Sequence, residues 1–201
     1  MNIMNMFSSP VFKDFLELDN DVLEQFCRAQ CINSKKNQDR GFSQSDNLDL
    51  QNPALLELVN CIQDRMNMLH LDLGLSNNFR SEVYQGWANL DNNWSIRIPH
   101  SHPEAAFACV YYVTGNPDAG NLEFINPNLA QSRTILPEHV GNFNEFTGST
   151  FKIRPIPGKL IIFPAWLYHY VNSGIGNDER ISIAFNIKII AGWRNGISEV
   201  S

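Results

Sequence analysis

Residues 180–190 read RISIAFNIKII, and this stretch decides the class of fold. Apolar side chains occupy every second position from Ile181 to Ile189, and arginine, serine, alanine, asparagine and lysine stand between them. A period of two is typical of a β-strand, because successive side chains of a strand point to opposite faces of the sheet. One face of this strand is predicted to pack in a core. The other face, which begins with Arg180 and Ser182, suits either solvent or the inside of a polar cavity.

Short segments of similar character begin at about residue 81, and Gly, Pro and Asn separate them. These segments are SEVYQGWANL (81–90), WSIRI (94–98), FACVYYVTG (107–115), NLEFIN (121–126), TFKIRPI (150–156), GKLIIFP (158–164) and WLYHYVN (166–172). Seven or eight strands without intervening helices predict a mainly β fold, either a sandwich, a barrel or a jelly roll. The polar stretch 127–149 is expected to form a long loop over the mouth of the sheet.

The first eighty residues have a different periodicity. Apolar residues recur at spacings of three and four in residues 12–31 and 52–75, which predicts two helices. Asn52 before Pro53 is a plausible cap for the second helix, and Gly74 a plausible end. The polar residues 33–51 between the helices are expected to form an exposed loop.

Composition limits the class of protein. With 201 residues, 43% apolar and 18% charged, the chain is expected to fold as a single soluble domain, residues 1–201, with a helical support region (1–80) and a β core (81–190). A net charge of −6 gives no basic signature for nucleic acid or an anionic membrane. The oligomeric state stays open, with a dimer as one expectation.

Location follows from the N-terminus and the cysteines. The start lacks the basic and apolar regions of a secretory signal, and no run approaches the roughly 18 apolar residues of a membrane span. We therefore expect a reduced, cytoplasmic protein, in the host cytoplasm if a phage encodes it. The scattered cysteines are expected to be structural thiols: Cys27, Cys31, Cys61 and Cys109.

Residues 100–104 read HSHPE, which places two histidines one residue apart with a carboxylate close behind. Iron(II) in oxygenases is held by two histidines and a carboxylate on one face, which leaves other positions for cosubstrate and oxygen. Residues i and i+2 of a strand project the same way, so His100 and His102, or His102 and Glu104, could reach one ion. A further ligand must come from another strand, and WLYHYVN offers His169. A polar turn with structural histidines is the competing interpretation.

A family resemblance then adds to these residues. HSHPEAAFACVYYVTGNPDAGNLEFINP (100–127), GKLIIFPAWLYHYV (158–171) and RISIAFNI (180–187) together resemble a family of 2-oxoglutarate- and iron(II)-dependent oxygenases. This family is related in core motif to the prolyl 4-hydroxylases and is found in marine bacteria and their phages. The resemblance covers roughly residues 83–190 and implies a double-stranded β-helix, which is a jelly-roll or cupin-like barrel. It also implies Fe(II), 2-oxoglutarate and O2 as the cofactor and cosubstrates of a hydroxylase.

The resemblance further implies an iron centre at His100, His102 and His169, and a clamp for 2-oxoglutarate at Arg180 and Ser182. The planar fork of arginine suits this task, because it pairs with a carboxylate through two charge-assisted hydrogen bonds. The structural alternative is an exposed Arg180 paired with Glu179 or Asp178. The spacing from His169 to Arg180 suits two adjacent antiparallel strands.

Two site assignments stay open. A triad of His102, Glu104 and His169 competes with the three histidines, which we prefer because Pro103 disfavours a continuous strand through Glu104. A tyrosine of VYYV is expected to contact 2-oxoglutarate, and alternation from His102 selects Tyr112 over Tyr111, although Pro103 interrupts it. Ala108 and Cys109 replace the serine and glycine that related chains usually have, so the packing near the site is altered.

The substrate is expected to be a peptidyl proline or a small molecule. The aromatic residues Tyr84, Trp87, Trp94 and Trp166 could line a groove for an extended peptide, although a structural role suits them equally. Two other functions remain as alternatives. One is a non-catalytic jelly-roll module that binds ligands or associates with virions, and the other is a cupin-type metal enzyme that does not use 2-oxoglutarate.

Overall fold

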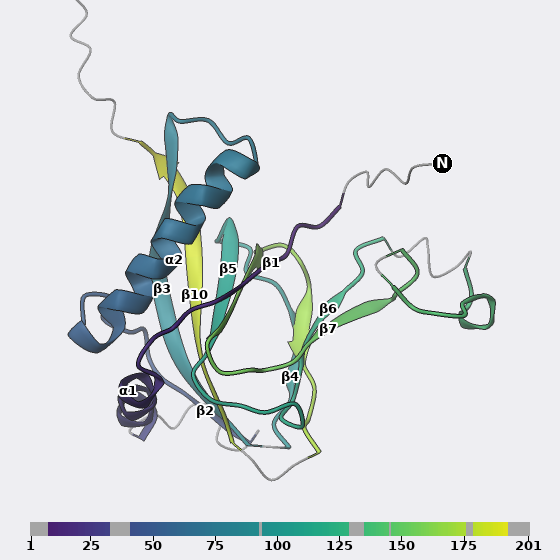
Figure 1. Ribbon diagram of the computed structural model, residues 1–201, viewed down its shortest axis with the longest axis horizontal. Coiled ribbons are helices and arrows are strands. Elements are labelled where there is room, and N and C mark those ends of the chain that lie inside the picture. Colours follow the sequence, from purple (N-terminus) through teal and green to yellow (C-terminus); the bar gives the residue numbers. More distant parts are fainter. Residues whose placement is uncertain are drawn as a thin grey trace, which may run out of the picture.

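The computed structural model describes residues 8–32, 41–92, 94–128, 135–144, 146–175 and 179–192. Its strands form two antiparallel sheets, and the helices lie against one of them (Figure 1). The elements are β1 (Phe12–Phe15), α1 (Asn20–Ile32), β2 (Phe42–Gln44), α2 (Pro53–Asp72), β3 (Phe79–Asp91), β4 (Arg97–His100), β5 (Phe107–Tyr112), β6 (Leu122–Ile125), η2 (Pro137–His139), β7 (Thr150–Ile153), β8 (Lys159–Pro164), β9 (His169–Val171) and β10 (Arg180–Ala191).

The two sheets differ in size. The larger has six strands in the order β1-β8-β5-β10-β3-β2, and the smaller has four in the order β4-β9-β6-β7. Each of the eight segments predicted as a strand contains one, from β3 to β10. The mainly β fold with helices near the N-terminus is therefore confirmed.

Strand β10 lies in the middle of the larger sheet, and both of its faces are covered. Ile181, Ile183 and Phe185 are fully buried in a core cluster that also contains side chains of α1 and α2. Arg180 and Ser182, on the opposite face, are also buried and point between the two sheets. The polar face of RISIAFNIKII therefore lines a cavity and is not exposed to solvent.

Strand β3 contains an irregularity that separates two parts of the sheet. It pairs in register with β10 from Asp91 opposite Arg180 to Gln85 opposite Asn186, after which Val83 stands opposite Ile187. Tyr84 is thus an extra residue in β3, which is a β-bulge. Beyond the bulge, Val83 joins Ile187 in the core cluster beneath the helices.

The N-terminal region differs from the prediction in two places. Residues 12–15, expected to begin a helix, form β1 and pair with β8 at the edge of the larger sheet. In the predicted loop 33–51, residues 42–44 form β2 on β3, and Phe42 and Leu48 are buried; residues 33–40 lie outside the described chain. In both cases a sheet edge offered main-chain hydrogen bonds that local periodicity does not reveal.

Helix α2 begins and ends where the sequence predicted. The side chain of Asn52 accepts a hydrogen bond from the backbone N–H of Ala54, and Pro53 occupies the first turn. Gly74 follows the helix with φ of 66°, a conformation that favours glycine. Within the described residues, no helix is both long and apolar enough to cross a membrane.

One prediction about placement is wrong. His169 in β9 and Arg180 in β10 do not lie on adjacent strands, because β9 belongs to the smaller sheet and β10 to the larger. The connection between them crosses from one sheet to the other. The described parts of residues 127–149 extend outward beyond β6 and β7 (Figure 1), and none of them is among the residues that line the cavity between the sheets.

Candidate metal centre and cosubstrate pocket

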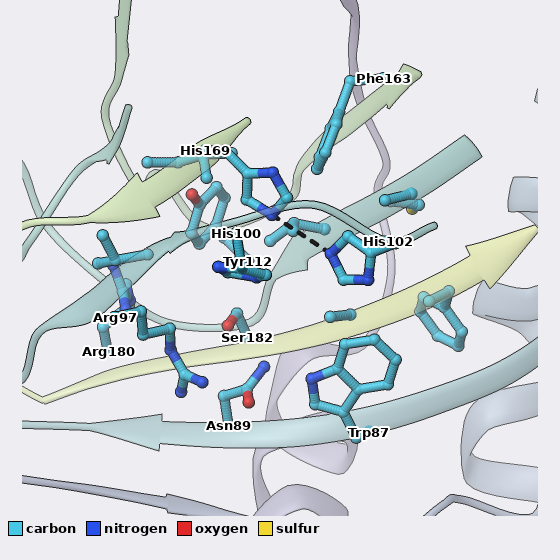
Figure 2. Close-up of a pocket in the computed structure, with 17 residues that line it drawn as sticks. Trp87, Asn89, Arg97, His100, His102, Tyr112, Phe163, His169, Arg180 and Ser182 are labelled. Atoms are coloured by element: carbon cyan, nitrogen blue, oxygen red, sulfur yellow. Dashed lines mark hydrogen bonds between the residues drawn. The ribbon is translucent and has the colours of Figure 1, made fainter. Parts of the chain in front are cut away.

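Three histidines converge between the sheets (Figure 2). His100 ends β4 and stands opposite His169, the first residue of β9. His102 follows by two residues, and its backbone N–H donates to the carbonyl of Ala165. Nitrogens of the three rings all lie within 4.8 Å of one another, and Nε2 of His102 is 3.3 Å from Nε2 of His169. Nitrogen ligands about 2.1 Å from a metal and at right angles lie roughly 3 Å apart, so this spacing suits a shared ion.

Main-chain carbonyls orient two of the rings. Nδ1 of His169 is 2.9 Å from the carbonyl oxygen of Leu167, and Nδ1 of His100 is 2.9 Å from that of Ile98. A ring N–H that donates to such a carbonyl leaves the lone pair on Nε2 free, which is the usual arrangement of a metal-binding histidine.

The surroundings keep the imidazoles of His102 and His169 neutral. Burial, and to a smaller extent the neighbouring His100, lowers the pKa of His102 to about 4. Burial also lowers the pKa of His169 to about 3, although its hydrogen bond to Leu167 opposes this shift. The ring of Phe163 packs edge-on against His169, with centroids 4.8 Å apart. Neutral imidazole is the form that binds metal, so both side chains are ready as ligands near pH 7.

Glu104 is not part of this group of residues. Its side chain is exposed, and its backbone oxygen accepts a hydrogen bond from the hydroxyl of Tyr84. The chain turns at Pro103, where the N–H of Ala105 donates to the carbonyl of His102. The turn directs Glu104 away from the three histidines, so the geometry favours a three-histidine site over the triad of His102, Glu104 and His169. His70 lies at the end of α2 and His139 in η2, both outside the group.

The larger sheet forms the floor of the cavity beneath the histidines, and its residues stand in rows across β5, β10 and β3. The rows are Arg180 with Asp91; Tyr112 with Ser182 and Asn89; and Val110 with Ala184 and Trp87. Because these rows lie in register, the floor changes from charged to polar to apolar along the strands. The inner cavity has a volume of about 60 Å³.

Arg180 is buried inside this cavity, with 3% of its surface exposed. Its Nη2 lies 2.8 Å from Oδ2 of Asp91, and its Nη1 donates to the carbonyl of Gly120. Its Nε is buried and has no hydrogen-bond partner among the described residues. The alternative of an exposed Arg180 paired with Glu179 is wrong, because Glu179 pairs with Arg28; Asp178 lies outside the described residues.

Asp91 also binds a second arginine. Arg97 of β4 donates from Nη2 to Oδ1 of Asp91 at 2.7 Å. Burial alone would raise the pKa of Asp91, but the attraction of Arg180 and then of Arg97 outweighs burial and lowers it. Asp91 is therefore a buried, charged carboxylate shared by two guanidinium groups.

The structure separates the two tyrosines of VYYV. Tyr112 lines the cavity beside Ser182, as alternation from His102 predicted, and burial raises its pKa to about 12. Its hydroxyl is therefore protonated and can donate a hydrogen bond. Tyr111 points to the other face of the sheet, where its hydroxyl donates to Asn20 at 2.7 Å.

An outer groove of about 420 Å³ adjoins the histidines. It is lined by Phe42, Gln44, Gln85, Trp87, Ile96, Arg97, Ile98, His100, His102 and Asn186. The groove lies between β2 and β4, which are edge strands of the two sheets. Trp87 connects it to the metal centre, since its ring stacks on His102 with centroids 5.9 Å apart. Of the aromatic residues predicted to line a groove, Trp87 does so, whereas Trp94 and Trp166 are more than half exposed.

Sequence reasoning missed Asn89, Asp91 and Arg97. The signal for the first two was present, because they follow Trp87 at intervals of two in the strand SEVYQGWANL and its next residue. Alternation would have placed Trp87, Asn89 and Asp91 on one face of β3. Arg97 carried no such signal, since its role depends on how the two sheets pack.

The donors fit iron(II) and 2-oxoglutarate. Three imidazoles converge at one side of the cavity, and nitrogen ligands of this kind suit iron. On the floor, Arg180 Nε and Asn89 Oδ1 are buried without partners in the described chain. Buried polar atoms are nearly always paired in folded proteins, so these atoms indicate the position of a polar ligand.

Two facing sheets with converging histidines between them define a metal-dependent enzyme of the double-stranded β-helix class. Residues 85–186, slightly more than half of the chain, match the family model described as "Putative 2OG-Fe(II) oxygenase", and the chain belongs to this family. Membership confirms the resemblance seen in the sequence, and with it an iron(II)- and 2-oxoglutarate-dependent oxygenase. An origin in marine bacteria or phages stays a prediction. None of the curated proteins matches the chain significantly.

Solved structures confirm the fold. A prolyl-4-hydroxylase from Pseudomonas putida is 14% identical with a TM-score of 0.59, over 90% of this chain and 94% of that one. HygX from Streptomyces hygroscopicus, with nickel and 2-oxoglutarate bound, is 12% identical with a TM-score of 0.58, over 90% and 83% of the two chains. A 2OG-Fe(II) oxygenase family oxidoreductase from Burkholderia pseudomallei is 13% identical with a TM-score of 0.56, over 83% and 77%.

Proposed function

We propose that this oxygenase hydroxylates a C–H bond of an uncharged substrate held in the outer groove, with His100, His102 and His169 as iron ligands. Arg180, Ser182 and Tyr112 bind the distal carboxylate of 2-oxoglutarate. The observation that carries this assignment is the unpartnered Nε of Arg180, which is buried in the same cavity as the three imidazoles.

Iron(II) and 2-oxoglutarate, when bound, supply the oxidising chemistry: the cosubstrate is decarboxylated to succinate, and one atom of O2 enters the substrate while the other enters succinate. The residues of the chain hold and orient these groups. The histidines present ring nitrogens, the hydroxyls of Ser182 and Tyr112 donate hydrogen bonds, and the guanidinium of Arg180 pairs with a carboxylate. Phe163 and Leu122 exclude water from the inner cavity.

The side chains that line the groove favour an uncharged substrate. Its lining consists of aromatic, aliphatic and amide side chains together with the histidines, and its one arginine, Arg97, is already bound to Asp91. A negatively charged group of a substrate would compete with 2-oxoglutarate for the same cation, and a positively charged group would find no carboxylate among the residues that line the groove. A prolyl residue within a peptide satisfies this requirement, and the likeness to a prolyl-4-hydroxylase supports it. A neutral small molecule satisfies it equally.

A cytoplasmic location is part of the proposal. All four cysteines are free thiols, and Cys27, Cys31 and Cys109 are buried. Unpaired cysteines are usual in proteins of a reducing compartment.

Turnover of 2-oxoglutarate in the absence of substrate tests this function. We expect slow formation of succinate that requires both iron(II) and oxygen, and that His169→Ala abolishes. Succinate and oxygen consumption should be measured together. Iron-dependent oxygen consumption that ignores 2-oxoglutarate would instead indicate a cupin-type metal enzyme, and neither binding nor turnover of 2-oxoglutarate would indicate a non-catalytic module.

A further inference from the structure

A buried carboxylate joins two guanidinium groups beside the cosubstrate pocket. Asp91 contacts Arg97 through Oδ1 at 2.7 Å and Arg180 through Oδ2 at 2.8 Å. The side chains of Asp91 and Arg180 are 1% and 4% exposed, and that of Arg97 is 15% exposed. The three residues come from β3, β10 and β4, so this network connects the larger sheet to the smaller one.

The network leaves one positive charge in excess. Asp91 and Arg180 alone would form a neutral pair, and a carboxylate ligand placed beside a neutral pair loses its hydration without an opposite charge to replace it. Arg97 adds the second cation. The excess is local, because the whole chain has a net charge of −6.

The position of Arg97 suits a role in the pocket. Its side chain lines both the inner cavity and the outer groove. Its guanidinium lies 3.9 Å from the centroid of the Phe42 ring, which holds it in place in addition to the bond with Asp91. The unpartnered Nε of Arg180 lies on the same floor, available to a ligand.

We propose that Asp91 and Arg97 determine the preference of this pocket for a 2-oxo acid with a second carboxylate. Asp91 is a positioning residue that holds Arg180, and Arg97 is a specificity-determining residue whose charge the distal carboxylate neutralises. This inference rests on the proposed role of Arg180 in binding 2-oxoglutarate.

Calorimetric titration of anaerobic, iron(II)-loaded protein tests it with two ligands. The first is 2-oxoglutarate, and the second is 2-oxopentanoate, which has the same carbon chain without the distal carboxylate. We expect Arg97→Gln to weaken binding of 2-oxoglutarate roughly ten- to hundredfold and to leave 2-oxopentanoate within about twofold, since a removed charge acts on the distal carboxylate alone. Arg97→Lys keeps the charge and should restore most of the preference.

Arg80→Gln is the matched control. Arg80 lies on β3, the strand of Asp91, but its side chain is exposed and pairs with Glu82. Arg80 is about 36 Å from Asp91 along the strand, at roughly 3.3 Å per residue. It should change neither affinity.

Equal losses of both ligands in Arg97→Gln and Arg97→Lys would show a merely structural role and overturn the inference. So would a loss in Arg97→Gln no larger than in Arg80→Gln, while the wild type still prefers 2-oxoglutarate. If the wild type binds both acids equally, or neither, the proposed role of Arg180 itself is wrong.

Discussion

His100 and His169 face one another across two neighbouring strands, so main-chain pairing fixes the position of both side chains. His102 is held differently, by a backbone hydrogen bond to Ala165 and by the turn at Pro103. The same turn directs Glu104 to solvent. The arrangement of ligands therefore depends on one proline, which directly follows the second histidine and lies in the turn that leads away from the site.

Replacing His169 by alanine should abolish iron binding, because it removes the most buried of the three nitrogen ligands. His102→Ala should do the same, and Glu104→Ala should retain one iron(II) per chain. Metal analysis of anaerobically purified variants measures this, with Glu104→Ala as the matched control from the same segment. Equal losses in His102→Ala and Glu104→Ala would restore the triad of two histidines and a carboxylate.

At the scale of single residues, the sequence predicted the positions that follow from the alternation of side chains along a strand. It placed Arg180 and Ser182 on one face of their strand and selected Tyr112 by alternation from His102, and the structure has all three lining one cavity. It did not predict the partner of Arg180. Asp91 lies far away in the chain, and only the pairing of β10 with β3 brings the two together.

Strand β10 connects the elements that form the site. It pairs with β5 on one side and β3 on the other, so its register determines which side chains stand together in each row. The smaller sheet adds the histidines from β4 and β9. Gly120, just before β6, joins the two parts, because its carbonyl accepts a hydrogen bond from Arg180.

Gly120→Ala should destabilise the fold and weaken 2-oxoglutarate binding. A Cβ at this position would lie 1.9 Å from the carbonyl oxygen of Asn172, so the backbone must shift and carry the acceptor of Arg180 with it. Overpacking of this kind typically costs about 1–3 kcal/mol. Thermal unfolding and calorimetry measure both effects.

Gly141→Ala is the control for this change, since its Cβ would meet nothing within 4 Å. Unchanged stability and affinity in Gly120→Ala would mean that the contact between Gly120 and Arg180 is unimportant.

The elements that the sequence predicted incorrectly share one cause. Residues 12–15 have helical spacing of apolar residues, yet the free edge of β8 recruits them as β1. Likewise, the spacing from His169 to Arg180 suits a hairpin, yet the chain crosses to the other sheet. Local patterns define the strands, whereas the partners of each strand depend on how two sheets close around a cavity.

In the whole molecule, the site lies between the six-stranded and the four-stranded sheet. The proposed iron ligands belong to the side of the smaller sheet, and the clamp for 2-oxoglutarate belongs to the larger. A cosubstrate that contacts the iron at one end and Arg180 at the other therefore bridges both sheets. Its binding should stabilise the entire fold.

Iron(II) and 2-oxoglutarate together should raise the unfolding temperature. A ligand at about 100 times its Kd adds about 2.7 kcal/mol, and for a chain of this size roughly 2–4 °C accompany each kcal/mol, which gives a shift of about 5–11 °C. Anaerobic calorimetry of the wild type measures the shift. His169→Ala should show none with iron, and an equal shift in that variant would place the metal elsewhere.

The bulge at Tyr84 also divides β3 into a part that can vary in length and a part that cannot. Between Gln85 and Asp91, one inserted residue would turn Trp87, Asn89 or Asp91 away from the cavity, because each step along a strand reverses the face. Beyond the bulge the alternation has already been reset, and this end of β3 meets α2 instead of the site: the carbonyl of Ser81 accepts a hydrogen bond from Gln63, and Val83 lies in the core cluster that includes α2. In evolutionary descent, insertions and deletions should therefore accumulate at the α2 end of β3, and the end that lines the cavity should change by substitution alone.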